Sequence, residues 1–180
     1  MQKHLYILTG GSRGMGLAIA HQLLQAEHEL ICISRHANEV LAAAAKKAEV
    51  SLSQWTQDLS DGQAASERLG HWLQQQDPAQ WCSAPLINNA GTIPPIAPLS
   101  QAHPQDLAQA LRVGLEAPMQ LCARFLGATE PWGLPRKVLN ISSGLGRKAM
   151  ASQAAYCAAK AGMDHFTRCL AMDEALKPQG

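Results

Sequence analysis

A tyrosine and a lysine four residues apart, Tyr156 and Lys160, are a pair whose types and spacing could do chemistry. Residues four apart on a helix are neighbours on one face. A nearby ammonium group favours the ionised form of a phenol, so the lysine would help the tyrosine to act as a general acid or base. Alone, the pair also fits an ordinary surface pair, because a chain with two tyrosines can carry one by accident.

A glycine-rich loop at residues 9–16 offers a site for phosphate. It lies between a predicted strand and a predicted helix, where free backbone N–H groups and the helix dipole favour a pyrophosphate. Its spacing, T-G-x-x-x-G-x-G, matches neither G-x-G-x-x-G nor Walker A, since no Gly-Lys-Ser/Thr follows. The loop therefore predicts dinucleotide binding and disfavours a nucleoside-triphosphate hydrolase. Glycines that merely close a turn are the alternative.

The residue that ends the second predicted strand is expected to meet the adenosine ribose of a dinucleotide. An acid there binds the ribose 2′-hydroxyl, whereas an arginine accepts a 2′-phosphate. Here the strand ends at Ser34 and Arg35, and the nearest carboxylate, Glu39, falls inside the next predicted helix. Arg13 in the glycine loop would add a second cation. These residues predict NADP(H), with two solvated surface arginines as the alternative.

Short apolar runs alternate with helical apolar spacing along the chain. The pattern predicts strands at residues 5–9, 29–34, 50–55, 85–88 and 137–142, and helices at 16–26, 37–48, 61–75, 100–115, 118–126 and 153–176. Strands that alternate with helices form a parallel sheet covered on both faces. We therefore expect one α/β domain over residues 1–180, a three-layer Rossmann-type doubly wound sheet.

Ligands of a doubly wound fold bind beyond the carboxyl ends of the strands. Four segments follow predicted strands, namely residues 10–16, Arg35, residues 88–91 and residues 142–146. The last contains Ser142 and Ser143, and Ser143 stands thirteen residues before Tyr156. Chemistry is expected in these segments.

Composition limits the partners. The chain is 47% hydrophobic and 16% charged, as in a globular protein with a sizeable core. Fifteen basic against fourteen acidic residues leave a net charge of +1, so there is no bulk basic field for a nucleic acid or an anionic membrane. No stretch approaches the roughly 18 apolar residues of a membrane span. We expect neither nucleic acid nor a membrane as partner.

The cysteines and histidines bear on metal binding, and the cysteines and the N-terminus bear on the compartment. The five cysteines are scattered without a C-x-x-C pair, which argues against a disulfide framework or a thiolate zinc site. The seven histidines form no i, i+4 pair and no cluster with carboxylates, so no metal is expected. The first apolar run is too short for a signal peptide. We therefore predict a cytoplasmic protein.

In their order, these segments resemble the short-chain dehydrogenase/reductase family. Five motifs that cover essentially the whole chain carry the resemblance: the loop at 9–16, Asp58-Leu59, residues 88–91, residues 140–143 and Tyr156-x-x-x-Lys160. Within the family, residues 88–92, 117–119, 140–144 and 155–157 look like the sepiapterin reductase and benzil reductase branch.

The resemblance implies an NADPH-dependent carbonyl reductase that transfers hydride to a small ketone or diketone. It makes Ser143 the donor that orients the carbonyl, Tyr156 the general acid, and Lys160 the residue that binds the nicotinamide ribose and tunes Tyr156. The expected cofactor-binding residues, with Asp58 and Leu59 at the adenine, are Gly10, Ser12, Arg13, Gly14, Met15, Gly16, Arg35, Asp58, Leu59, Asn88, Ala90, Gly91, Tyr156 and Lys160.

Two features depart from the family pattern. The family places a catalytic asparagine between valine and leucine after the fourth strand, whereas this chain has Val113-Gly114-Leu115. Gly114 removes the side chain on which a water relay to Lys160 would be built. The chain is also shorter than the resemblance implies. The C-terminal part of the family fold is absent from it, so the fifth strand is expected to be an exposed edge.

Two other functions stay open from the sequence. A nucleotide-binding sensor or interaction protein without turnover would fit Gly114 and the short chain. An epimerase or dehydratase of the extended relatives also uses Tyr-x-x-x-Lys, but it prefers T-G-x-x-G-x-x-G, which residues 9–16 do not match.

The last predicted helix could also hold subunits together. It carries small residues that permit close packing, with an apolar stripe of Met163, Phe166 and Leu170. A second copy on this helix would give a homodimer or homotetramer. Burial of the stripe inside one subunit is the alternative.

Overall fold

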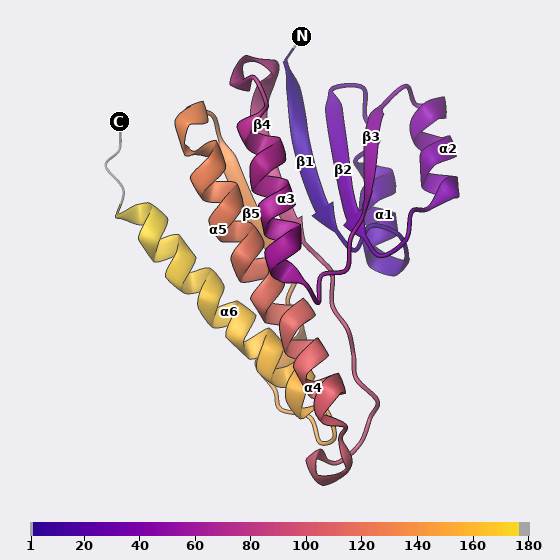
Figure 1. Cartoon of the computed structure of the whole chain (residues 1–180), viewed down its shortest axis with the longest axis vertical. Helices are drawn as coiled ribbons and strands as arrows, with labels where there is room; N and C mark the ends of the chain where they lie inside the picture. The colour runs from indigo at the N-terminus through magenta and orange to yellow at the C-terminus, as the bar shows by residue number, and fades with distance from the viewer. Residues whose placement is uncertain (1, 177–180) are drawn as a thin grey trace.

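The computed structural model describes residues 2–176, which form a five-stranded parallel sheet with helices on both faces (Figure 1). The strands are β1 Lys3–Thr9, β2 His28–Ser34, β3 Ser51–Thr56, β4 Trp81–Asn88 and β5 Arg136–Asn140. Their order is β3-β2-β1-β4-β5, and all neighbours are parallel. The chain changes its direction across the sheet between β1 and β4, which makes this the topological switch point. The predicted doubly wound α/β fold is confirmed.

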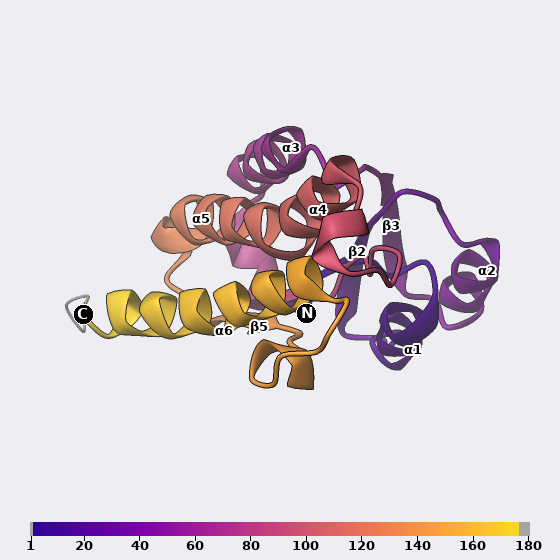
Figure 2. The same cartoon turned by 90° about the horizontal axis from the view of Figure 1, so that it is seen from below.

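Helices form the two outer layers (Figure 2). One face of the sheet carries α1 Gly14–Gln22 and α2 Glu39–Lys47. The other carries α3 Gly62–Gln74, α4 Pro104–Leu111, α5 Ala117–Thr129 and α6 Ala154–Ala175. None of the helices within residues 2–176 has the length and apolar character needed to cross a membrane.

Alternate residues of the central strand fill two separate cores. Leu5 and Ile7 of β1 are fully buried against the α3 and α5 layer, and Leu8 is fully buried on the α1 and α2 side. A parallel strand covered on both faces needs apolar residues in both directions, which explains the nearly continuous apolar run of β1.

β1, β4 and β5 each differ from the prediction by two residues or more at one end, and β1 starts at Lys3 instead of residue 5. β4 starts at Trp81 instead of residue 85, because its first half mixes polar and apolar residues and shows no apolar run. It pairs with β1 from Lys3 onward, with a register shift between Lys3 and His4. β5 stops at Asn140, two residues early, so Ser142 lies in the following loop.

The two helices predicted after β4 are one nearly continuous run. It begins at Pro104, four residues later than predicted, because proline suits the first helical position. A π-helical turn, Arg112–Glu116, joins α4 to α5. Such turns shift the helix face by about one residue and often occur at functional sites.

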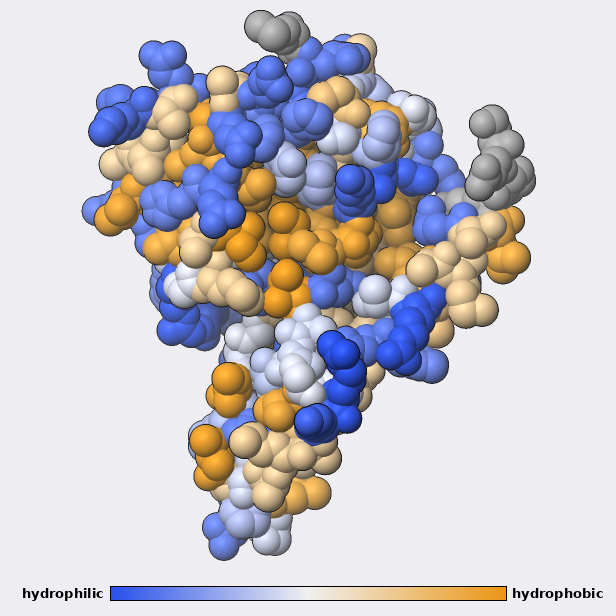
Figure 3. Space-filling model, turned by 180° about the vertical axis from the view of Figure 1, so that it is seen from behind, coloured by the Kyte–Doolittle hydropathy of each residue, from blue (hydrophilic) through white to orange (hydrophobic). Residues whose placement is uncertain are grey.

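The last strand and helix bear on assembly. Within residues 2–176, β5 has β4 as its one neighbour, which confirms the predicted exposed edge. Leu139 of β5 is 52% exposed, and Figure 3 shows apolar side chains gathered across the middle of this side of the molecule. On α6, Met163 is fully buried, and Phe166 and Leu170 pack on the subunit's own core. The apolar stripe of α6 thus packs, fully at Met163 and in part at Phe166 and Leu170, on its own subunit.

Candidate active site

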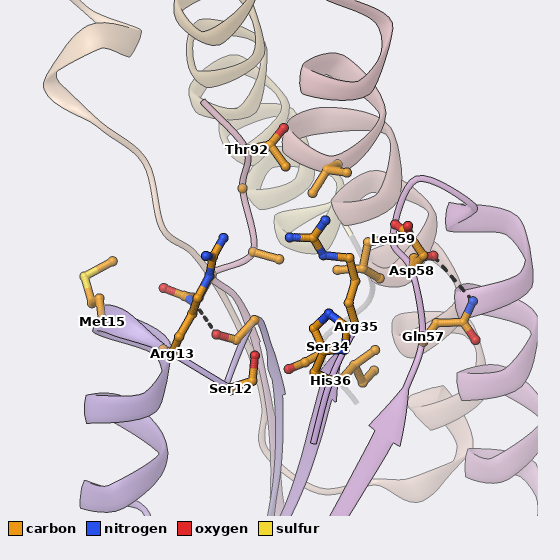
Figure 4. Close-up of a pocket in the computed structure, with 18 of the residues that line it drawn as sticks. Ser12, Arg13, Met15, Ser34, Arg35, His36, Gln57, Asp58, Leu59 and Thr92 are labelled. Carbon is orange, nitrogen blue, oxygen red and sulfur yellow. Dashed lines mark hydrogen bonds between the residues drawn. The ribbon is translucent and has the colours of Figure 1, made fainter. Parts of the chain in front are cut away.

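A cavity of about 420 Å³ opens at the carboxyl ends of β1 to β4 (Figure 4). Its wall includes every residue predicted in the glycine loop, Arg35, Asp58 and Leu59, and Ala90 and Gly91. In the part of the chain that the structure describes, no group of three or more His, Cys, Asp or Glu side chains is placed to hold a metal ion.

The glycine loop makes its turn through two close backbone contacts. Gly10 has a φ of 71°, which favours glycine, and its N–H donates to the Ile33 carbonyl at 2.8 Å. A Cβ on Gly16 would overlap the Gly10 carbonyl oxygen and the Asn89 amide. The loop therefore lies close against the first turn of α1, whose residues Gly14, Met15 and Gly16 line the cavity.

Asn89 and Thr9 join the glycine loop to the segment after β4. The Thr9 hydroxyl accepts the N–H groups of Asn89 at 3.0 Å and Ala90 at 3.1 Å. The Asn89 amide donates to the Thr9 carbonyl at 3.1 Å and the Gly10 carbonyl at 3.3 Å. These bonds fix the two sides of the switch point together. Asn89 belongs to the motif at residues 88–91, but its residue type and spacing do not predict this role.

Asn88, which the sequence assigned to the cavity wall, is 1% exposed and does not line it. Its side chain turns into the protein and donates to the Asn140 amide oxygen at 2.9 Å. Side chains alternate between the two faces along a strand, so one of two adjacent asparagines has to point inward. Asn89, one residue later, lines the cavity instead.

Asn38 supports the glycine loop from the side. Its carboxamide oxygen caps α2 by accepting the Leu41 N–H at 2.8 Å, and its Nδ2 donates to the Ser12 carbonyl at 2.9 Å. An asparagine before a helix is a recognisable cap signal in a sequence. Its second bond, to a loop 26 residues earlier, is not.

Two cations and a hydroxyl stand at the end of the cavity next to β2. Figure 4 shows the side chains of Arg13 and Arg35 extending into the same open space. Ser34 lines the cavity, and its hydroxyl oxygen is buried without a hydrogen-bond partner among the described residues. The carboxylate in the cavity wall, Asp58, already accepts the Ser60 N–H at 2.9 Å. This end of the cavity suits an anion.

The predicted Tyr156 and Lys160 pair stands beside the cavity. The Lys160 Nζ lies 5.8 Å from the centroid of the Tyr156 ring and donates to the Ile141 carbonyl at 2.7 Å. The ammonium also lies next to the cavity wall, because a Cβ added to Gly91 would be 3.9 Å from it. The structure thus brings the first turns of α6, the end of β5 and the segment after β4 to one place.

Lys160 is an unusually buried lysine, with 4% of its surface exposed. Burial lowers the pKa of its ammonium group, and the Asp164 carboxylate, one helical turn later, partly opposes this change. The hydrogen bond to the Ile141 carbonyl compensates part of the lost hydration.

Ser143 lies at the start of a short turn that touches α6. Its hydroxyl accepts the Leu145 N–H at 3.2 Å and keeps its own proton available as a donor. The turn ends at Gly146, where an added Cβ would lie 3.0 Å from the Lys160 carbonyl and 2.8 Å from an Asp164 carboxylate oxygen. Glycine at 146 therefore lets the serine loop approach the helix that carries Tyr156.

Gly114, the residue that departs from the family pattern, has a packing reason. It is buried in the π-helical turn, and a Cβ on it would lie 3.1 Å from the Ala159 Cβ. A larger side chain would push on α6 next to Lys160.

The sheet order, the glycine turn at the switch point and the cavity beside it define a Rossmann-type α/β protein. The family model of short chain dehydrogenases matches residues 4–178. The chain belongs to the short-chain dehydrogenase family.

Similar proteins include carbonyl reductases. Benzil reductase ((S)-benzoin forming) of Bacillus cereus is 35% identical over 95% of this chain and 69% of its own length. The same enzyme of Bacillus subtilis is 32% identical over 94% and 67%. Sepiapterin reductase of Xenopus tropicalis is 31% identical over 94% and 68%. The resemblance seen in the sequence motifs is confirmed.

Solved structures agree with this assignment. A short-chain dehydrogenase/reductase from Burkholderia vietnamiensis has a TM-score of 0.81 and 34% identity, over 95% of this chain and 80% of that one. A metagenomic short-chain oxidoreductase in complex with NADP also has a TM-score of 0.81, with 28% identity over 96% and 77%.

Proposed function

We propose that this protein is an NADPH-dependent reductase of ketones or diketones, with Tyr156 as the general acid. The observation that carries the proposal is the Tyr156 and Lys160 pair, held by the Ile141 carbonyl beside Gly91 of the cavity. The benzil reductases among its relatives support a carbonyl substrate.

Each of the three side chains has one task. NADPH, when bound, supplies the hydride that reaches the carbonyl carbon. Ser143 donates a hydrogen bond to the carbonyl oxygen and orients it. Tyr156 gives its phenolic proton to the same oxygen as negative charge develops there, and the Lys160 ammonium stabilises the resulting phenolate. Lys160 also binds the nicotinamide ribose, which the nearness of its Nζ to Gly91 supports.

Oxidation of NADPH by a diketone tests the function directly. Absorbance of NADPH is followed in the presence of benzil and, separately, of a small aliphatic diketone. Turnover supports the reductase. Tight binding of NADPH without turnover of any ketone, diketone or pterin carbonyl supports the sensor alternative, which Gly114 motivates.

Arg35→Asp is expected to reverse the preference for the phosphorylated cofactor. Arg35 and Arg13 line one end of the cavity with Ser34, whose hydroxyl has no hydrogen-bond partner among the described residues, so this end suits an anion. Loss of one charge-assisted contact costs about 1.5–3 kcal/mol, which is about 10- to 150-fold in affinity. Binding of NADPH and NADH is measured by titration, with Arg124→Asp on the exposed face of α5 as control. A wild type that prefers NADH, or an unchanged ratio in Arg35→Asp, contradicts the assignment.

We also propose a cytoplasmic homodimer or homotetramer. All five cysteines are free thiols, which suits a reducing compartment. Ala154, Ala158 and Ala161 leave small exposed side chains along α6, on which a second helix can pack closely. Sedimentation at micromolar concentration is expected to give a dimer or tetramer, and a monomer would rule this out.

A further inference from the structure

A line of side-chain hydrogen bonds crosses the molecule below the catalytic pair. The Asn88 amide of β4 donates to the Cys122 sulfur of α5 at 3.3 Å and to the Asn140 oxygen of β5 at 2.9 Å. Asn140 Nδ2 donates to the Thr167 hydroxyl of α6 at 2.9 Å. The Thr167 hydroxyl donates to the Met163 carbonyl at 2.7 Å. Four elements are joined by one chain of neutral groups.

This chain of hydrogen-bonded side chains ends next to Lys160. Lys160, Met163 and Thr167 are spaced i, i+3 and i+7, so they share one face of α6. That face meets the end of β5, where Ile141 follows Asn140 directly. Ile141 receives the Lys160 ammonium on its carbonyl at 2.7 Å, and its own N–H donates to the Asn88 carbonyl at 2.9 Å. Asn88 and Asn140 of the hydrogen-bonded chain therefore lie beside Ile141, whose carbonyl accepts the hydrogen bond from Lys160.

The side chains of this hydrogen-bonded chain are polar, although apolar packing alone could hold the helices on the sheet. Asn88 and Cys122 are each 1% exposed, and burial raises the pKa of the Cys122 thiol to about 12, so it stays neutral. Buried amides add little net stability over apolar residues, but their hydrogen bonds form only in a narrow range of orientations. These hydrogen bonds can thus fix the position of α6 along β5 more precisely than apolar contacts would.

We propose that Asn140 and Thr167 are positioning residues of the active site, which fix α6 on the end of β5 so that Lys160 reaches both Tyr156 and the cofactor ribose. The proposal rests on the proposed function. It assigns no contact with substrate to either residue.

Thr167→Val tests it, because valine keeps the shape and removes the hydroxyl. The variant is expected to lower kcat about tenfold, the scale of a small misplacement of catalytic groups, and to leave KM for the carbonyl substrate nearly unchanged. Affinity for NADPH is expected to fall about threefold through the ribose contact of Lys160. Thr167→Ser restores the hydroxyl and is expected to restore both values.

Thr129→Val is a matched control. Thr129 is fully buried in α5, and its hydroxyl donates to the Phe125 carbonyl at 2.7 Å, the same bond that Thr167 makes to Met163. It has no place in the chain of side chains, so the variant is expected to lose thermal stability without a change in kcat or NADPH affinity. Asn140→Leu, of similar volume, opens the chain from β5 and is expected to behave like Thr167→Val.

Three outcomes separate the two proposals. Equal kinetics in Thr167→Val and Thr129→Val, or no rescue by serine, would show that the chain only stabilises the fold and would overturn the inference. A wild type that turns over no carbonyl refutes the proposed function, and the NADPH affinities of the same variants then still decide the positioning role. Should Thr167→Val not fold, Asn140→Leu provides the comparison.

Discussion

Tyr156→Phe is expected to abolish carbonyl reduction while NADPH binding stays nearly unchanged. The phenolic proton is needed only as negative charge develops on the substrate oxygen, so its loss removes an interaction of the transition state and lowers kcat. General acid catalysis contributes about 10²- to 10⁴-fold, and the rate should fall by that amount. The phenyl ring keeps its packing 5.8 Å from the Lys160 Nζ, so the lysine stays in place.

The second tyrosine of the chain supplies the control for this experiment. Tyr6 lies on β1 with its ring 4.5 Å from that of His28, and it does not line the cavity. Tyr6→Phe should reduce the carbonyl substrate at the rate of the wild type. NADPH oxidation and NADPH titration are measured for both variants. Turnover by Tyr156→Phe within about fivefold of the wild type would exclude the phenol as general acid.

The sequence predicts the residues of the cavity wall more completely than the contacts of Tyr156 and Lys160. Residues after parallel strands meet at one edge, so the positions of Gly10 and Arg35 followed from strand ends alone, whereas Asp58 was expected there only through the family resemblance. Tyr156 and Lys160 also followed from spacing on one helix. Helical spacing does not state which carbonyl the lysine meets, and its anchor on Ile141 comes from tertiary packing.

The interpretations that changed have physical reasons. Asn88 and Asn89 cannot be told apart by residue type, and the strand's alternation decides which one enters the cavity. Gly114 leaves out the asparagine side chain of the family pattern, and the structure adds that a Cβ there would lie 3.1 Å from the Ala159 Cβ. A π-helical turn changes the facing of every later residue, and the spacing of apolar residues gives no sign of it.

Gly16→Ala is expected to weaken cofactor binding strongly. Gly16 is the position where α1 meets the turn after β1, and an added Cβ would overlap the Gly10 carbonyl oxygen and the Asn89 amide. Neither atom is the free end of a flexible chain, because Asn89 is held by its bonds to Thr9 and Gly10. The loop and α1 must separate, at a cost of about 1–3 kcal/mol in stability. The N–H groups that we propose to bind the pyrophosphate then move, and NADPH affinity is expected to fall roughly 100-fold.

A second glycine distinguishes this backbone contact from a general effect of alanine. Gly127 lies on the exposed face of α5, and a Cβ there has no atom within 4 Å. Gly127→Ala is expected to leave NADPH binding unchanged and to raise stability by about 0.5–1 kcal/mol, because alanine is the better helix former. Thermal unfolding and NADPH titration are measured for both variants. If Gly16→Ala binds NADPH as the wild type does, the loop at residues 9–16 is not the pyrophosphate site, and the glycines only close the turn.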